Sequence, residues 1–299
     1  MTTLTHVDED LFRSSLPFLY LSPGLKLSSP KEVVFLRPTM DYSEFEEMFD
    51  KHPTNTKAVV EIEHATETAR KAIQSLKPDD DAIYSHLNRL SSKRVRELVQ
   101  KDRRYNVMMS IYDAGDVNFG LVRYMYIYWL QGKVPESPTY AGTSVEDPHL
   151  NGIFITMNQH GFLTCDSQSY MYDISDVSTT IQRPYIVGIM GVNHAIEMTK
   201  RIQGKYQIYV VSHDQEEIDF KLSAPLTYDL EPGVEPNEKN YFTSVPGLKF
   251  DTHGIVEKIE NPELLATVTI VYPNFDDPDS DRMMTDVMNA VVETHSIYS

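Results

Sequence analysis

The chain of 299 residues is 41% hydrophobic and 24% charged, which is ordinary for a soluble globular protein. This length allows two domains, or one large domain with a sizeable core. The formal net charge of −17 argues against general nucleic-acid binding, because phosphate contacts require a cationic surface.

Three features predict a soluble, intracellular and cytoplasmic protein. The only cysteine, Cys165, excludes an intramolecular disulfide and fits a reducing compartment. The acidic N-terminus lacks the basic start and apolar run of a signal peptide. The most hydrophobic stretch, residues 121–130, contains Arg123 and is too short to span a bilayer.

Residues 1–115 are predicted to form a Pro-rich arm followed by a mainly helical region. Four prolines interrupt the apolar bursts of the first 40 residues. A capping box predicts a short helix over residues 43–49, and helical periodicity predicts a longer helix over 56–76. A further helix is expected after the acids at 79–81, which suit the positive end of its dipole.

Charge is distributed unevenly along the chain. Residues 70–104 hold ten lysines and arginines against five acids, whereas residues 205–299 hold six against eighteen. Such an uneven charge distribution is typical of two oppositely charged faces that are both exposed to solvent. It is also typical of surfaces that orient a partner or a second copy. The helix dipole gives the basic run a structural explanation, and binding of an acidic partner is the functional alternative. The candidate basic interaction patch consists of Arg89, Lys93, Arg94, Arg96, Lys101, Arg103 and Arg104.

Residues 116–131 are predicted to form the most aromatic helix, which Gly132 ends. An aromatic stripe at helical spacing is typical of a buried core, with a stacking or interface role as the alternative. The aromatic residues of this helix are Phe119, Tyr124, Tyr126, Tyr128 and Trp129.

Residues 150–192 are the most structured stretch of the sequence. Apolar residues at helical spacing predict a helix over residues 148–160, which Gly161 ends. The elements expected next are a strand over 162–165, a polar loop over 166–180, a strand over 182–189, a helix over 193–203 and a strand over 206–211. A central domain over residues 116–213 is therefore predicted to have a mixed α/β core with the order helix, strand, strand, helix, strand.

Residues 214–299 are predicted to form an acidic C-terminal extension. Strands are expected over residues 257–260 and 266–272, with a turn at Asn261-Pro262 between them, and a final helix follows Asp281. The predicted fold class is thus α+β. It combines a mainly helical N-terminal region, the mixed core, and a C-terminal strand pair plus helix.

The central stretch resembles an uncharacterised domain family of actinobacterial and large DNA virus proteins. The family pattern is a helix ending in Trp-Leu-x-Gly, then Leu-Asn-x-x-Gly-Phe-x-Thr-x-x-Ser-Gln, then Gln-Arg at the start of a strand. The matching segments are Trp129-Leu130-Gln131-Gly132, Met157-Asn158-Gln159-His160-Gly161-Phe162-Leu163-Thr164-Cys165-Asp166-Ser167-Gln168 and Gln182-Arg183. Met157 replaces the usual Leu, and Ser169-Tyr170 replaces a frequent Pro-Gly. The resemblance covers about residues 117–213 and implies a fold and candidate residues, but no reaction.

Polar residues gather at the facing ends of the two predicted central strands, and they form the candidate polar site. Its members are Thr164, Cys165, Asp166, Ser167, Gln168, Gln182 and Arg183. If the strands pair antiparallel, the two groups meet at one end of the sheet. Asp166 and Arg183 would then tie the loop to the sheet, or Arg183 would hold an anionic ligand. Catalysis is the third alternative.

A catalytic site would need a nucleophile beside a base. Cys165 or Ser167 would be the nucleophile, and His160 or His194 would be the base. The sequence contains no recognisable catalytic motif that would favour a catalytic role of the candidate polar site over a structural role.

Other motifs predict neither a metal nor a cofactor. The alternating aspartates of 277–281 resemble the start of a calcium loop, but Arg282 and Met288 stand where Gly and Glu are required, which favours helix capping. Gly188 and Gly191 are too few for a nucleotide fingerprint and favour a tight strand-to-helix turn. The histidines lack zinc-binding spacing.

We therefore expect a non-enzymatic structural or protein-interaction protein. The resemblance implies a virus-encoded virion or assembly component, with a virion location if the chain is viral. Protein partners, including further copies of the chain, are expected, whereas nucleic-acid binding and a membrane span are not. The alternative is a small-ligand-binding or hydrolytic enzyme that uses the polar residues at 164–168 and 182–183.

Overall fold

The computed structural model describes residues 19–21, 47, 102–139, 148–174, 179–212, 227–230, 241–242, 251–275 and 278–298. The predicted Pro-rich arm and the predicted helices over 56–76 and after 81 lie outside these residues. The short helix predicted over 43–49 is described only at Glu47, which is helical. Within the described part, helices pack against a largely antiparallel sheet, which confirms the predicted α+β class.

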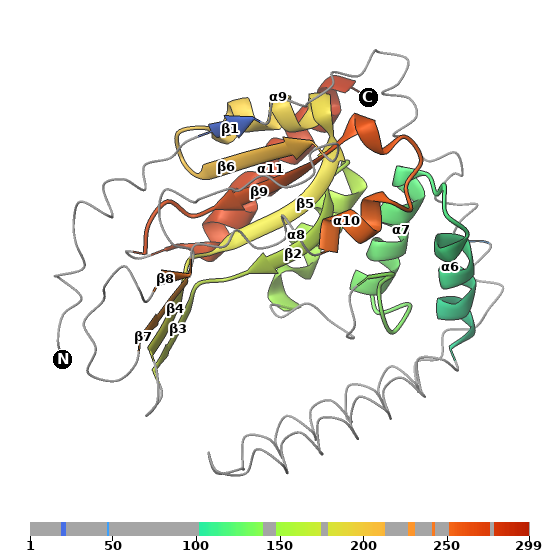
Figure 1. Ribbon diagram of the computed structural model, residues 1–299, viewed down its shortest axis with the longest axis horizontal. Helices are drawn as coiled ribbons and strands as arrows, with labels where there is room; N and C mark the ends of the chain where they lie inside the picture. The colour runs from blue at the N-terminus through green and yellow to red at the C-terminus, as the bar shows by residue number, and fades with distance from the viewer. Residues whose placement is uncertain are drawn as a thin grey trace, which may run out of the picture.

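A five-stranded sheet forms the centre of the fold (Figure 1). Its strands, in spatial order, are β1 (Leu19–Leu21), β6 (Gln207–Ser212), β9 (Leu265–Val271), β5 (Tyr185–Gly191) and β2 (Leu163–Gln168). β1 and β6 run parallel, and every other neighbouring pair runs antiparallel. The sequence-based boundary after residue 213 therefore falls within one sheet, because β9 lies between β5 and β6.

The three inner strands are apolar because both of their faces are buried. Every residue of β5 and of β9 is buried. One cross-strand row faces the main hydrophobic core and consists of Ile186, Ile270 and Ile208. The adjacent row passes through Thr269, which is also fully buried. This double burial explains the nearly continuous hydrophobic runs of these strands.

A second sheet continues from the first. Its order is β3 (Met171–Ile174), β4 (Thr179–Gln182), β7 (Thr227–Leu230) and β8 (Tyr241–Phe242), all antiparallel. β2 leads directly into β3, and β4 leads directly into β5, so the four segments form one long hairpin. The predicted polar loop over 166–180 is therefore wrong. β2 continues through Gln168, and most of the remaining segment belongs to β3 and β4.

Three helices pack together behind the sheet in the view of Figure 1. They are α8 (Asn151–Gln159), α9 (Val192–Ile202) and α11 (Ser280–Tyr298). α11 packs against both α8 and α9, and α9 contacts strands β5, β6 and β9. These contacts place the C-terminal helix at the centre of the helical layer.

The aromatic helix predicted over 116–131 is α7 (Phe119–Leu130), which packs against α8. The Asn118 side chain accepts a hydrogen bond from the Gly120 amide at 2.8 Å, which starts the helix. All of its residues except Tyr124 are buried, as expected for core. Tyr126 and Trp129 pack edge to face with ring centroids 6.3 Å apart.

The remaining helices flank this body. The sequence did not indicate α6 (Arg103–Ala114), which begins where Asp102 accepts a hydrogen bond from the Tyr105 amide. α10 (Asp251–Val256) precedes the short 3-10 helix η4 (Pro262–Leu264). The predicted strand over 257–260 is wrong, because only Ile259 makes a bridge, to Val117. Among the described helices, none combines the length and the apolar character needed to cross a membrane.

Candidate functional site

The residues of the candidate polar site at 164–168 lie on β2, an outer strand of the five-stranded sheet. β2 runs antiparallel to β5, with Gln168 opposite Tyr185. The two predicted groups are therefore brought to the same end of the sheet, in the expected hairpin arrangement. Each of the five side chains on β2 is half-buried.

The start of β2 is anchored to α8. Asn158, which is fully buried, donates from Nδ2 to the Thr164 Oγ1 at 2.9 Å and to the Phe154 carbonyl at 2.8 Å. The Cys165 thiol donates to the Leu163 carbonyl at 3.5 Å. Thr164 and Cys165 thus have local structural partners on or beside their own strand.

A β-bulge shifts the register of β2. Thr164 lies opposite Gly188 and Asp166 lies opposite Val187, so Cys165 is the additional residue. Asp166 Oδ2 accepts a hydrogen bond from the Tyr185 hydroxyl at 3.0 Å. Bulges and charged side chains are two features by which edge strands avoid unspecific pairing.

Arg183 lies in the interior, between β4 and β5, and is 0% exposed. Its Nη1 donates to Gln207 Oε1 at 3.2 Å and to the carbonyls of Tyr272 and Pro273 at 3.1 and 3.3 Å. The guanidinium also lies 5.3 Å from the centre of the Phe275 ring. Arg183 therefore joins the hairpin to β6 and to the end of β9, whereas Asp166 is held by Tyr185.

The outer edge of the long hairpin is continuous. β2 ends the order of the first sheet and β3 begins the order of the second, so residues 163–174 follow one edge, which we call the β2–β3 edge. The Tyr170 amide donates to Ser280 Oγ at 2.8 Å and fixes the junction between the two strands to the start of α11. Gln182, at the end of β4, is half-buried opposite Met171.

Tyr172, on β3, is an exposed large hydrophobic residue, at 47%. Sequence reasoning missed it because residues 166–180 were assigned to a loop. Tyr170, Tyr172 and Ile174, which favour strands and stand at alternate positions, were the available signal for a strand. Ile297, on α11, is the other exposed large hydrophobic residue among those described.

A second cluster of polar residues, which the sequence did not indicate, lies where four helices meet. The His160 and His295 rings pack edge to face with centroids 5.2 Å apart. Burial, together with the neighbouring His295 and Arg123, lowers the pKa of His194 to about 4. We call His160, His194, His295 and Arg123 the histidine cluster.

Arg123, on α7, is the arginine of the histidine cluster. Its Nη1 donates to the Asn158 carbonyl at 2.8 Å, and its guanidinium lies 5.2 Å from the centre of the Phe119 ring. Desolvation by burial lowers the Arg123 pKa to about 10, which leaves it charged at neutral pH. Within the described ranges, no three His, Cys, Asp or Glu residues are arranged to hold a metal ion.

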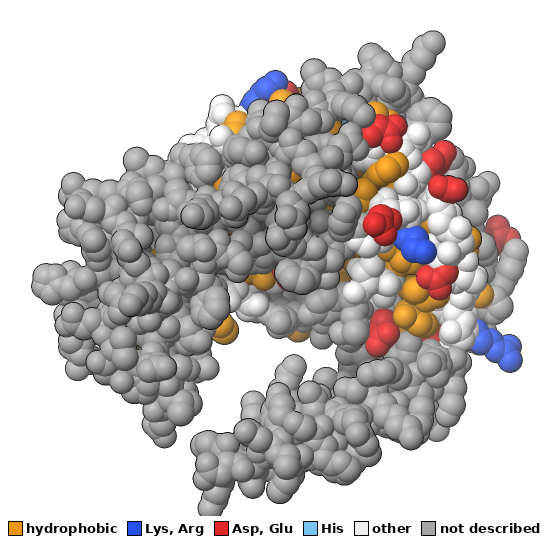
Figure 2. Space-filling view, in the orientation of Figure 1, with side chains coloured by type: hydrophobic (Ala, Val, Ile, Leu, Met, Phe, Trp, Pro, Cys, Tyr) orange, Lys and Arg blue, Asp and Glu red, His pale blue; other side chains and the backbone are white. Residues whose placement is uncertain are grey.

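The charged surface near α6 and α10 is acidic. Figure 2 shows several acidic side chains gathered over the described part of the visible face. The acids contributed by the α6–α7 and α10–η4 segments are Asp113, Asp116, Glu257, Glu260 and Glu263. Of the predicted basic interaction patch, only Arg103 and Arg104 lie in the described residues, and Arg104 is buried.

The comparisons with known proteins do not assign the chain to a family. No protein-family model matches the sequence, and no curated protein matches it. The resemblance to actinobacterial and viral domains therefore stays a prediction.

Proposed function

We propose that this chain is a non-enzymatic protein-interaction protein that binds an extended segment of a partner along the β2–β3 edge. The observation that carries the proposal is the position of β2 and β3 on one continuous edge, each as an outer strand among the strands that the structure describes. An outer strand presents backbone N–H and C=O groups that an extended polypeptide can pair with. The polar residues at 164–168 are then contact residues rather than catalytic ones.

The side chains on this edge fit a role in selecting the partner. Strand addition takes its affinity from main-chain hydrogen bonds and its specificity from alternating side chains. Tyr172 supplies an aromatic contact with its 47% exposure, and Ser167 and Gln168 supply hydroxyl and amide groups. The bulge at Cys165 and the charge of Asp166 disfavour pairing with an arbitrary strand.

Charge favours a basic partner over a second copy of the chain. The net charge of −17 makes two copies repel each other, and the acidic surface near α6 and α10 contributes to the negative electrostatic potential of the chain. A partner segment with lysines or arginines beside its extended part would be attracted to such a surface. The sequence resemblance suggests an assembly, in a virion if the chain is viral, as the setting.

Selection of linear peptides from a random displayed library tests this proposal. Peptides that bind the wild-type chain are expected to be rich in basic residues and to lose at least about tenfold in affinity at high salt. Tyr172→Ala should weaken them by about tenfold or more, since it removes an aromatic contact without changing the charge of the surface. Ile297→Ala is the matched control, because it removes another exposed large hydrophobic side chain, on α11.

Two results would count against the proposal. Equal binding of the selected peptides by Tyr172→Ala and wild type would place their site elsewhere. A concentration-dependent dimer that Tyr172→Ala abolishes would instead identify a second copy as the occupant of the edge.

A further inference from the structure

The side of the five-stranded sheet opposite β2 is closed by β1, the shortest of its described strands. β1 has three residues, whereas β6 pairs with β9 along all of Gln207–Ser212. The register places Leu19–Leu21 opposite residues 208–210, each of which is 0% exposed. A short strand therefore covers the edge of a buried one and pairs with backbone groups that would otherwise face outward.

Leu19 continues a row of the main hydrophobic core across the sheet. Its partner on β6 is Ile208, which lies in one row with Ile270 and Ile186. The half-buried Leu19 packs against the same core. Side chains at directly paired positions of neighbouring strands interact on one face of a sheet, so the β6 edge presents an apolar position that Leu19 fills.

The segment that contains β1 differs in composition from the rest of the chain. Residues 14–25 carry no charged side chain, although 24% of all residues are charged. Pro17 and Pro23 stand on either side of β1. Proline has no N–H to donate, so these two residues limit the length of the strand. The β6 edge thus accepts a short, uncharged segment, whereas the β2–β3 edge carries polar side chains.

β1 is positioned by pairing and packing rather than by a turn. It runs parallel to β6, whereas the other neighbouring strands described in this sheet run antiparallel. A parallel pair cannot be joined by a tight hairpin turn and needs a long crossover connection. Strands β2 to β5 all lie between β1 and β6 in the sequence. Because no turn ties β1 to β6, the same segment of another chain finds the same pairing and packing there.

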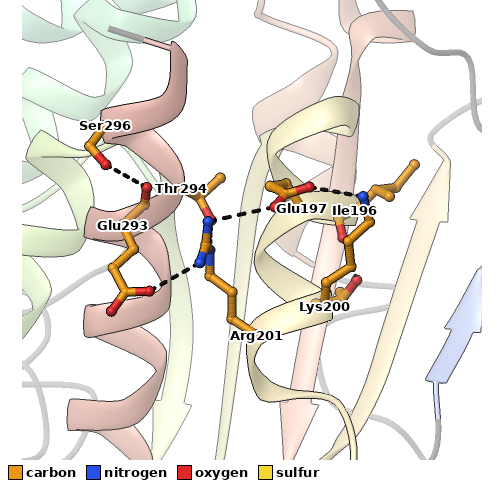
Figure 3. Close-up of polar contacts among 8 residues, drawn as sticks. Ile196, Glu197, Lys200, Arg201, Glu293, Thr294 and Ser296 are labelled. Atoms are coloured by element: carbon orange, nitrogen blue, oxygen red, sulfur yellow. Dashed lines mark hydrogen bonds and ion pairs between the residues drawn. The ribbon is translucent and has the colours of Figure 1, made fainter.

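The strand β6 is held in place independently of β1. β9 pairs with its whole length, and just before β6 begins, Lys205 Nζ and the Tyr206 hydroxyl donate to Asp286 of α11 at 3.0 and 2.9 Å. The helix α9, which packs on β6, is joined to α11 by Arg201, whose Nη1 lies 3.1 Å from Glu293 Oε2 (Figure 3). These contacts keep the acceptor strand in position when β1 leaves it.

We propose that the β6 edge is a second strand-binding site, at which Leu19–Leu21 of a second copy replaces β1 of the chain itself. Exchange of an identical segment is a low-cost route to a dimer, because the contacts formed are those already present within one chain. The net charge of −17 opposes the approach of two copies, so salt, which screens this repulsion, favours the exchange. The site is independent of the β2–β3 edge, which lies at the other end of the strand order.

A capped peptide of residues 14–25 is the probe for this site. The full chain with Leu19→Asp, whose own β1 no longer suits the apolar position, should bind the peptide at least about tenfold more tightly than wild type, in which the edge is occupied. The matched control is the same peptide with Leu19→Asp, which should bind this variant at least about tenfold more weakly. High salt should not weaken binding of the uncharged peptide, whereas it weakens basic peptides on the β2–β3 edge.

Sedimentation of the wild-type chain over a range of concentrations tests the exchange itself. A dimer is expected at high protein concentration and high salt, and an excess of the peptide should return it to monomer. Tyr172→Ala should leave this dimer intact, which distinguishes it from pairing through the β2–β3 edge. This measurement decides the proposal even if Leu19→Asp does not fold.

Three results would overturn the exchange site. One is a folded Leu19→Asp chain that does not bind the peptide. Another is equal affinity of the wild-type and Leu19→Asp chains for the peptide, because its site would then not be the one that β1 occupies. The third is a wild-type chain that stays monomeric at high concentration and high salt, which would restrict the β6 edge to the chain's own segment.

Discussion

The Phe162 ring lies directly over Gly188, where any side chain on the glycine would meet it. A Cβ at position 188 would overlap ring atoms Cε1 and Cζ of Phe162 and would lie 2.6 Å from the Leu163 carbonyl oxygen. Gly188 is therefore inside β5 because two strands and a buried ring approach closely there. The predicted strand-to-helix turn is formed by Gly191 alone, which ends β5 and caps α9.

Gly188→Ala is expected to lower the free energy of unfolding by about 3 kcal/mol, because the added methyl group meets backbone as well as a ring. Urea denaturation of the variant and wild type gives the difference. Gly152→Ala is the matched control. Its new Cβ would meet nothing within 4 Å, so an increase of up to about 1 kcal/mol is expected from helix propensity. A neutral Gly188→Ala would contradict this packing.

Arg183→Met is expected to cost about 3 kcal/mol of stability, because it leaves the Gln207 amide oxygen and two carbonyls without their buried donor. The exposed Arg103→Met should change stability by less than about 0.5 kcal/mol. Thermal and urea unfolding check both values. An unchanged melting temperature in Arg183→Met would support the ligand-binding interpretation of Arg183 over the structural one.

The depressed pKa of His194 predicts a loss of stability in acid. Its folded pKa of about 4 lies below the usual value of 6.5, so the unfolded chain takes up a proton first. No cost arises above the unfolded value, and the cost grows as pH falls toward the folded value. It reaches about 3 kcal/mol near pH 4.5.

Urea unfolding between about pH 7.5 and about pH 4.5 measures this loss in wild type and in His194→Gln. The variant should show a shallower dependence on pH, by up to about 1.4 kcal/mol per pH unit, whatever its stability at neutral pH. Parallel pH profiles for the two proteins would show that His194 is not the group responsible.

Asp286→Ala is expected to destabilise the protein by about 1–2 kcal/mol, since Lys205 and the buried Tyr206 both lose their acceptor. Glu293→Ala removes an exposed ion pair with Arg201 and should cost less than about 1 kcal/mol. Denaturation at neutral pH ranks the two variants. The reverse order would show that α11 is held mainly through Arg201.

Local sequence patterns predicted the inner elements of the fold well. The helices expected over 116–131 and 193–203 correspond to α7 and α9, and the strands expected over 206–211 and 266–272 correspond to β6 and β9. Each of these elements buries a broad apolar surface. The spacing of the apolar residues along its own sequence therefore identifies it as a helix or a strand. The stop at Gly132 also lies as expected, with a φ of 68° that suits glycine.

Features that depend on distant residues could not be predicted. β3 and β4 lie in a stretch rich in polar residues and their pairing extends to β7, so the short alternation of Tyr170, Tyr172 and Ile174 was a weak local signal for them. The position of β9 between β5 and β6 likewise depends on pairing between residues that are far apart in the sequence. Arg183 donates hydrogen bonds to carbonyls 89 and 90 residues away, and the histidine cluster draws on four separate helices.

The most direct test of the proposed function is residue-resolved amide exchange, by NMR, with a selected basic peptide bound. Strand addition on the β2–β3 edge predicts that the amides of residues 163–174 that face away from β5 and β4, other than the Tyr170 amide bonded to Ser280, slow by at least about tenfold. Amides of α9 should be unchanged. Unchanged exchange along the edge, with protection elsewhere on the surface, would contradict the proposal that this edge binds the partner.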